Sequence, residues 1–118
     1  MNQDTLTQLK LLNEYINSYY VMKEMDGDKL SYLIQKITGS LYYLETVRSE
    51  THKRYEASVF NLVKDGNSVA RAINETNVNI PEMYQLRRIM DGGYRIVDAI
   101  RTNISYLKSE RINTNQQV

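Results

Sequence analysis

The chain has 118 residues, the usual size of one domain, and no cysteine, which excludes disulfide bonds, thiolate zinc sites and a cysteine nucleophile. Its net charge is +1, which is neither that of a strongly basic nucleic-acid protein nor that of an acidic one. Residues 1–66 carry eight basic against nine acidic side chains and residues 67–118 carry seven against five, so the C-terminal half is mildly basic. Hydrophobic residues make up 42%, and the largest of them are ten tyrosines, against one phenylalanine, Phe60, and no tryptophan, which predicts a thin core.

The first predicted helix begins near Asp4 or Thr5 and ends at Asp26-Gly27-Asp28. In that tripeptide the glycine suits a left-handed backbone and an aspartate suits the cap of the following helix. The predicted apolar face of this helix consists of Leu6, Leu9, Leu12, Ile16, Tyr19 and Tyr20.

The second predicted helix begins at Lys29 and continues to about Val63, a length of about 50 Å at 1.5 Å per residue. Its sequence becomes polar at Arg48, Thr51 and Ser58, so we expect tight packing in its first half and looser packing beyond. The apolar positions of the first half alternate in steps of four and three: Leu30, Ile34, Ile37, Leu41 and Leu44.

A turn at residues 64–67, with Ser68 as a cap, predicts a short third helix through Val69, Ala72 and Ile73. Residues 77–80 are expected to be irregular. Pro81 suits the first turn of a final helix, which should run to about Arg111. Residues 1–112 are thus predicted to form one helical domain, and residues 113–118 a disordered polar tail.

The final helix carries a second stripe of apolar residues with the same spacing, which is typical of helices that wrap around one another. The sequence therefore predicts an all-α fold: an elongated hairpin of two long helices with shorter helices, self-associating through these stripes. The residues expected to form the contact between subunits are Met83, Leu86, Met90, Val97, Ile100, Ile104 and Leu107.

Catalytic and metal-binding patterns are weak. The single His52 lies in a polar stretch and is interpreted as a surface residue, and Asp26 and Asp28 lack the rest of a calcium loop. Gly92-Gly93 has no preceding strand or following lysine, so it is interpreted as a place of close helix approach or a kink. We therefore expect no enzyme, metal or cofactor.

Basic residues recur near the end of the second helix and at the start of the last one, where they offer salt-sensitive contacts to a phosphate backbone. Tyr55, Tyr84 and Tyr94 lie nearby in sequence as candidate stacking surfaces for bases, although a solvated charged face is the simpler interpretation. The candidate nucleic-acid-binding residues are Lys53, Arg54, Lys64, Arg87 and Arg88.

Two segments of the sequence carry a resemblance to a known family. The first is the stretch from Thr51 to Gly66, THKRYEASVFNLVKDG, a charged helix end that runs into a glycine turn. The second is the stretch from Gly92 to Arg101, GGYRIVDAIR, followed by ISYLK at residues 104–108. They resemble, respectively, the middle and the C-terminal helix of the phage recombination mediator family (UvsY-like). The likeness covers roughly residues 31–108.

The resemblance implies a DNA recombination and repair protein that binds single-stranded DNA as an oligomeric ring. Its partners would be a recombinase and the single-stranded-DNA-binding protein that covers the strand. The family has basic side chains just before the glycine turn, whereas this chain has Ala57 to Phe60 there, so Lys53, Arg54 and Lys64 would supply the charge.

Two other classes of function stay open: a phage structural or adaptor protein that forms a helical ring, and a helical chaperone whose tyrosines and methionines line a groove for a partner. The chain opens with no basic segment followed by an apolar stretch, and no window approaches about 18 apolar residues. We therefore expect a soluble cytoplasmic protein with no membrane contact.

Overall fold

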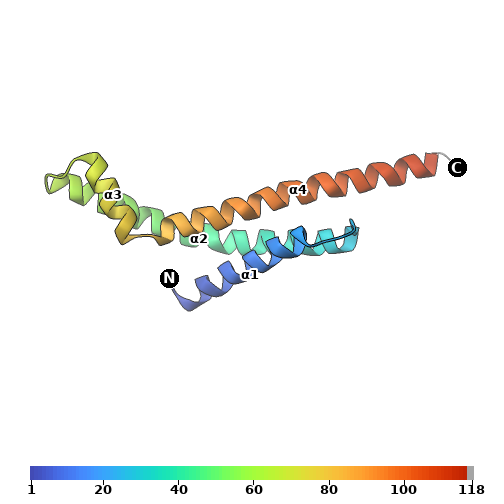
Figure 1. Ribbon diagram of the computed structural model, residues 1–118, viewed down its shortest axis with the longest axis horizontal. Coiled ribbons are helices and arrows are strands. Elements are labelled where there is room, and N and C mark those ends of the chain that lie inside the picture. Colours follow the sequence, from blue (N-terminus) through green and yellow to red (C-terminus); the bar gives the residue numbers. More distant parts are fainter. Residues whose placement is uncertain (117–118) are drawn as a thin grey trace.

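The computed structural model describes the backbone of residues 1–116 and the side chains of residues 1–112, and over this part the chain is all-α. The described helices are, in order, α1 (Gln3–Tyr20), α2 (Gly27–Lys64), α3 (Val69–Asn79) and α4 (Glu82–Gln116). α1 and α4 run antiparallel to α2, and α3 packs on the far end of α2 (Figure 1). The molecule measures 74 × 27 × 21 Å, so the predicted elongated hairpin of two long helices is confirmed.

The connection between α1 and α2 differs from the prediction. α1 ends at Tyr20, before the predicted stop, and α2 begins at Gly27 instead of Lys29. Asp26 is the cap of α2, because its Oδ1 accepts hydrogen bonds from the backbone N of Asp28 at 2.9 Å and of Lys29 at 3.3 Å. Gly27 is therefore helical and does not have the left-handed backbone expected of it.

The left-handed glycine lies instead at the other end of α2. Among the described residues Gly66 alone has a positive φ, of 103°, and it follows the last turn of α2. Such a backbone is strained for a residue with a side chain, so glycine is the residue that permits this turn. The turn reverses the chain so that α3 folds back onto α2.

α3 is longer than predicted. It runs to Asn79, so the prediction of an irregular backbone is wrong for residues 77–79. The extra turn is held by the buried Thr76, whose Oγ1 shares a hydrogen bond of 2.9 Å with Ser58 Oγ on α2. Pro81 directly precedes α4, close to its predicted place in the first turn.

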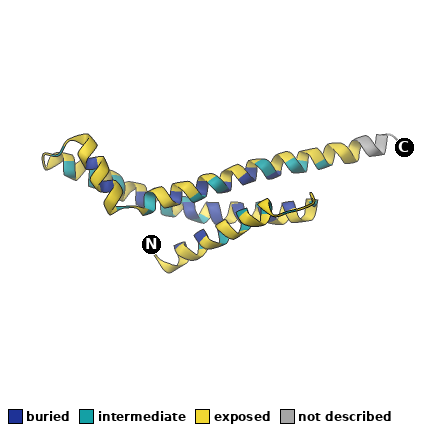
Figure 2. Ribbon diagram, in the orientation of Figure 1, coloured by how far each residue is buried: buried dark blue, intermediate teal, exposed yellow. Residues whose placement is uncertain are grey.

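The hydrophobic core lies where α1, α2 and α4 face one another (Figure 2). Leu6 and Tyr20, predicted on the apolar face of α1, are instead exposed. Beyond Leu44, Thr51 is the one buried side chain of α2, which follows the predicted change to a polar seam. The buried core residues are Leu9, Leu12, Leu30, Leu33, Ile37, Leu41, Leu44, Leu86, Met90, Ile96, Val97 and Ile100.

The apolar stripe of α4 is covered largely within the chain. Leu86, Met90, Val97 and Ile100 are each at most 5% exposed and belong to the core shared with α1 and α2. These four positions are therefore covered within one chain, without a second subunit. The three remaining residues of the predicted subunit contact are partly buried: Met83, Ile104 and Leu107.

Gly93 lies where α4 packs tightly against leucines of α1 and α2. A Cβ atom at this position would stand 3.1 Å from Leu41 Cδ2 and 3.3 Å from Leu12 Cδ1, whereas one at Gly92 would meet Ile16 Cδ1 at an ordinary 3.7 Å. The sequence predicts that a neighbouring backbone approaches the glycine pair or that the helix kinks there, whereas the atoms that a Cβ at Gly93 would meet are side-chain methyl groups of leucines on α1 and α2.

α4 continues to Gln116, past the predicted end at Arg111, so the backbone of residues 113–116 is helical and not the expected tail. Gln117 and Val118 lie outside the described residues. The C-terminal part of α4 extends beyond the α1–α2 connection (Figure 1), and its described side chains are mostly exposed (Figure 2).

A polar contact ties α2 to α4 outside the core. The Tyr94 hydroxyl donates a hydrogen bond to Glu45 Oε1, and Arg48 pairs with Glu45 Oε2 at 3.0 Å. The hydrogen bond from Tyr94, reinforced by Arg48, holds the pKa of Glu45 below its ordinary value, and it raises the pKa of Tyr94.

We expect Tyr94→Phe to raise the pKa of Glu45 toward its ordinary value, measured by NMR titration of the carboxyl group. Because the folded-state pKa of Glu45 is lowered, its contribution to stability is present at neutral pH and is lost as the pH falls through the lowered pKa. The variant should therefore lose less stability in mild acid than the wild type. An unchanged Glu45 titration would show that this hydrogen bond does not form in solution.

Candidate nucleic-acid interface

A groove of about 550 Å³ opens where α2, the end of α3 and the first turns of α4 meet. We call it the junction groove. Its lining brings together residues from three helices. The aromatic, amide and basic side chains among them are His52, Tyr55, Asn77, Tyr84, Gln85 and Arg87. An aromatic and cationic lining of this kind suits a ligand with flat rings and negative charge.

Hydrogen bonds between α2 and α3 fix one wall of the junction groove. The Tyr55 hydroxyl donates to Asn77 Oδ1 at 2.6 Å, and the neighbouring Ser58 and Thr76 side chains are also hydrogen-bonded. α4 also lines the groove, among others through Tyr84, which is 68% exposed. One tyrosine is thus held in place and the other lies free at the surface.

Arg87 and Arg88 do not form one strip. Arg87 lines the junction groove, whereas Arg88 lines a separate groove of about 530 Å³ beside Lys10 of α1. Tyr84 and Gln85 border both grooves, so this turn of α4 separates them. Neighbouring residues of a helix point about 100° apart, which explains the divergence.

The three candidate cations of α2 also separate. Arg54 Nη2 pairs with Glu82 Oε1 at 3.2 Å, which commits this side chain to the contact between α2 and α4. Lys53 and Lys64 lie about three helical turns apart, roughly 16 Å at 1.5 Å per residue, on the exposed side of α2. Phe60, which is 67% exposed, lies between them in sequence.

Four of the five candidate cations have no acidic partner within the described chain. The ion pairs there join Glu45 to Arg48, Arg54 to Glu82 and Arg101 to Asp98, and His52 Nε2 lies 2.9 Å from Glu56 Oε1. Uncompensated cations raise the local positive potential that attracts a phosphate backbone. The candidates outside these pairs are Lys53, Lys64, Arg87 and Arg88.

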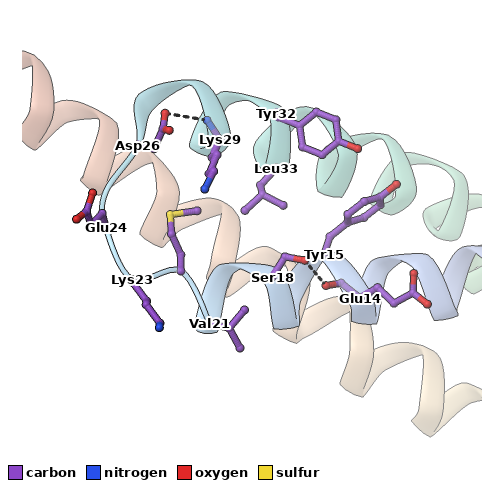
Figure 3. Close-up of a pocket in the computed structure, with 11 residues that line it drawn as sticks. Glu14, Tyr15, Ser18, Val21, Lys23, Glu24, Asp26, Lys29, Tyr32 and Leu33 are labelled. Atoms are coloured by element: carbon purple, nitrogen blue, oxygen red, sulfur yellow. Dashed lines mark hydrogen bonds between the residues drawn. The ribbon is translucent and has the colours of Figure 1, made fainter.

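A larger groove of about 780 Å³ lies at the other end of the bundle, between α1 and the start of α2 (Figure 3). The rings of Tyr15 and Tyr32 lie edge to face there, with centroids 6.5 Å apart. Three carboxylates, Glu14, Glu24 and Asp26, also line it, together with two lysines, Lys23 and Lys29. The carboxylates outnumber the lysines, so this α1–α2 groove lacks the net positive charge that attracts nucleic acid.

The sequence pointed to some lining residues of the junction groove and missed others. Tyr55, Tyr84 and Arg87 are predicted residues that the structure brings together. Asn77 was missed because irregular backbone was expected there, and nothing in the sequence linked Gln85 to Tyr55. His52 is an exposed surface residue as predicted, paired with Glu56 at 2.9 Å, and it also lines the groove.

Within the described residues, no three histidine, cysteine or acidic side chains come together as a metal site would require. None of the helices in this part of the chain combines the length and apolar character needed to cross a membrane. Neither family models, nor curated proteins, nor solved structures match the chain.

Proposed function

We propose that the protein is a non-enzymatic recombination mediator of the UvsY-like kind. In this role it binds single-stranded DNA as an oligomer in the cytoplasm and helps to load a recombinase onto strands covered by single-stranded-DNA-binding protein. The observation that carries the proposal is the junction groove, where two tyrosines lie beside Arg87, a cation with no acidic partner in the described chain.

The balance of charge supports weak binding by each subunit. Arg54 is neutralised in part by Glu82, and the remaining candidate cations are spread over several faces. An oligomer repeats each weak contact, so that linked sites together reach an affinity that one site lacks. Because the core occupies most of the α4 stripe, Met83, Ile104 and Leu107 are the predicted contact residues that keep some surface exposed to a second subunit.

The proposal is tested by titrating a fluorescent oligothymidylate with the protein at rising salt. We expect binding at low salt that weakens steeply, because phosphate contacts release counterions. Arg87→Glu combined with Lys53→Glu should lower the affinity and flatten the salt dependence, by about one unit of slope for each lost contact.

A matched control is Lys23→Glu combined with Lys29→Glu, which makes the same change of charge beside the α1–α2 groove. This control should bind nearly as well as the wild type. An equal loss of affinity for the oligonucleotide in both double variants would show that binding follows net charge alone. If the wild type ignores the oligonucleotide even at low salt, the mediator function is wrong.

The second candidate function is that of a helical chaperone or adaptor. The α1–α2 groove favours it, because Tyr15, Tyr32 and Met22 offer an adaptable aromatic and thioether lining to a partner helix (Figure 3). Absence of DNA binding together with stable co-purification of one partner protein would support this alternative.

A further inference from the structure

We infer that the junction groove holds one unstacked base of the bound single strand, so that the protein contacts bases as well as phosphates. This inference rests on the proposed function and adds to it a specific site. It is carried by three features of the groove: its aromatic walls, an amide that is free to donate, and a cation at its edge.

The aromatic walls suit a flat ring. Tyr84 is 68% exposed, so its ring is open to a ligand in the groove. Tyr55 lies in the same groove and is held by its hydrogen bond to Asn77, so little side-chain freedom is lost when a ligand stacks there. Stacking on tyrosine tolerates every base because each base has a π-face.

The amide of Asn77 supplies a directional contact. Its Oδ1 accepts the hydrogen bond from Tyr55, which leaves both hydrogens of Nδ2 available to a ligand in the groove. Gln85, on the α4 side, adds a second amide. Carbonyl oxygens of a base are suitable acceptors for these donors.

Arg87 places positive charge in the same groove, where it suits the phosphate next to the base. It takes part in none of the ion pairs of the described residues. The groove volume of about 550 Å³ falls in the range of small-molecule sites, about 300–1,000 Å³. The α1–α2 groove, although larger, is lined by three carboxylates against two lysines, so it lacks net positive charge.

The inference is tested with two single-stranded probes of equal length and charge: an oligothymidylate and an oligonucleotide whose sites are all abasic. We expect the wild type to prefer the oligothymidylate at the same salt. Tyr84→Ala should weaken binding of the oligothymidylate about 5- to 100-fold and leave binding of the abasic probe unchanged. Tyr84→Phe, which keeps the ring, should bind like the wild type.

Since Tyr84 is exposed, its replacement leaves the fold intact, which circular dichroism checks. Arg87→Ala is the comparison variant and should weaken binding of both probes. Equal wild-type affinity for the two probes, with no effect of Tyr84→Ala, would overturn the base site and leave DNA binding through phosphates in place. Failure to bind either probe at low salt would instead overturn the proposed function, and the base site with it.

Discussion

Ile100→Asp should unfold the chain. Ile100 is fully buried among the core residues of α1, α2 and α4, so the substitution places a carboxylate where no water or cation reaches it. Burial of an unpaired charge together with loss of an apolar side chain costs more than about 4 kcal/mol, a large part of a total stability of about 5–15 kcal/mol. Circular dichroism and urea titration measure the loss.

The matched control is Ile112→Asp, on the same helix. Ile112 is 55% exposed, so this change should alter the free energy of unfolding by less than about 0.5 kcal/mol. Analytical ultracentrifugation of both variants gives the particle mass, which distinguishes a residue of the core from a residue between subunits. A folded Ile100→Asp protein with a smaller particle mass would show that this residue lies between subunits and that the core described above is wrong.

Gly93→Val should be the second strongly destabilising change. A Cβ at Gly93 already stands 3.1 Å from Leu41 and 3.3 Å from Leu12, and the two methyl groups of valine would force the three helices apart. Overpacking of this kind lowers the free energy of unfolding by about 1–3 kcal/mol, which outweighs the better helix propensity of valine over glycine. Thermal unfolding followed by circular dichroism gives the size of the effect.

Gly92→Ala is the control for Gly93. Its Cβ would meet Ile16 at 3.7 Å, an ordinary contact, so the gain in helix propensity of about 1 kcal/mol should appear as higher stability. A lower free energy of unfolding for Gly93→Val and a higher one for Gly92→Ala would establish the tight packing at Gly93. A Gly93→Val protein as stable as the wild type would mean that the helices pack less closely than the structure shows.

The candidate binding residues illustrate what a linear pattern cannot give. Arg87 and Arg88 are neighbours in sequence, yet the helix turns them into different grooves. In the sequence, Arg54 and Lys53 are equivalent candidates for a phosphate contact. In the fold, the chain returns at Pro81 and places Glu82 Oε1 3.2 Å from Arg54 Nη2, so Arg54 is engaged in an ion pair. Such contacts join residues far apart in the sequence, so spacing along one helix does not reveal them.

By itself the sequence determined that helices form and where α3 and α4 begin, because the period of the apolar residues, the cap at Ser68 and the proline at Pro81 are local signals. The tertiary structure alone decided what covers the α4 stripe: apolar spacing shows that a face needs a partner, and a helix of the same chain satisfies that need as well as a second subunit does. The junction groove likewise exists only because α3 folds back on α2 and places Asn77 beside Tyr55.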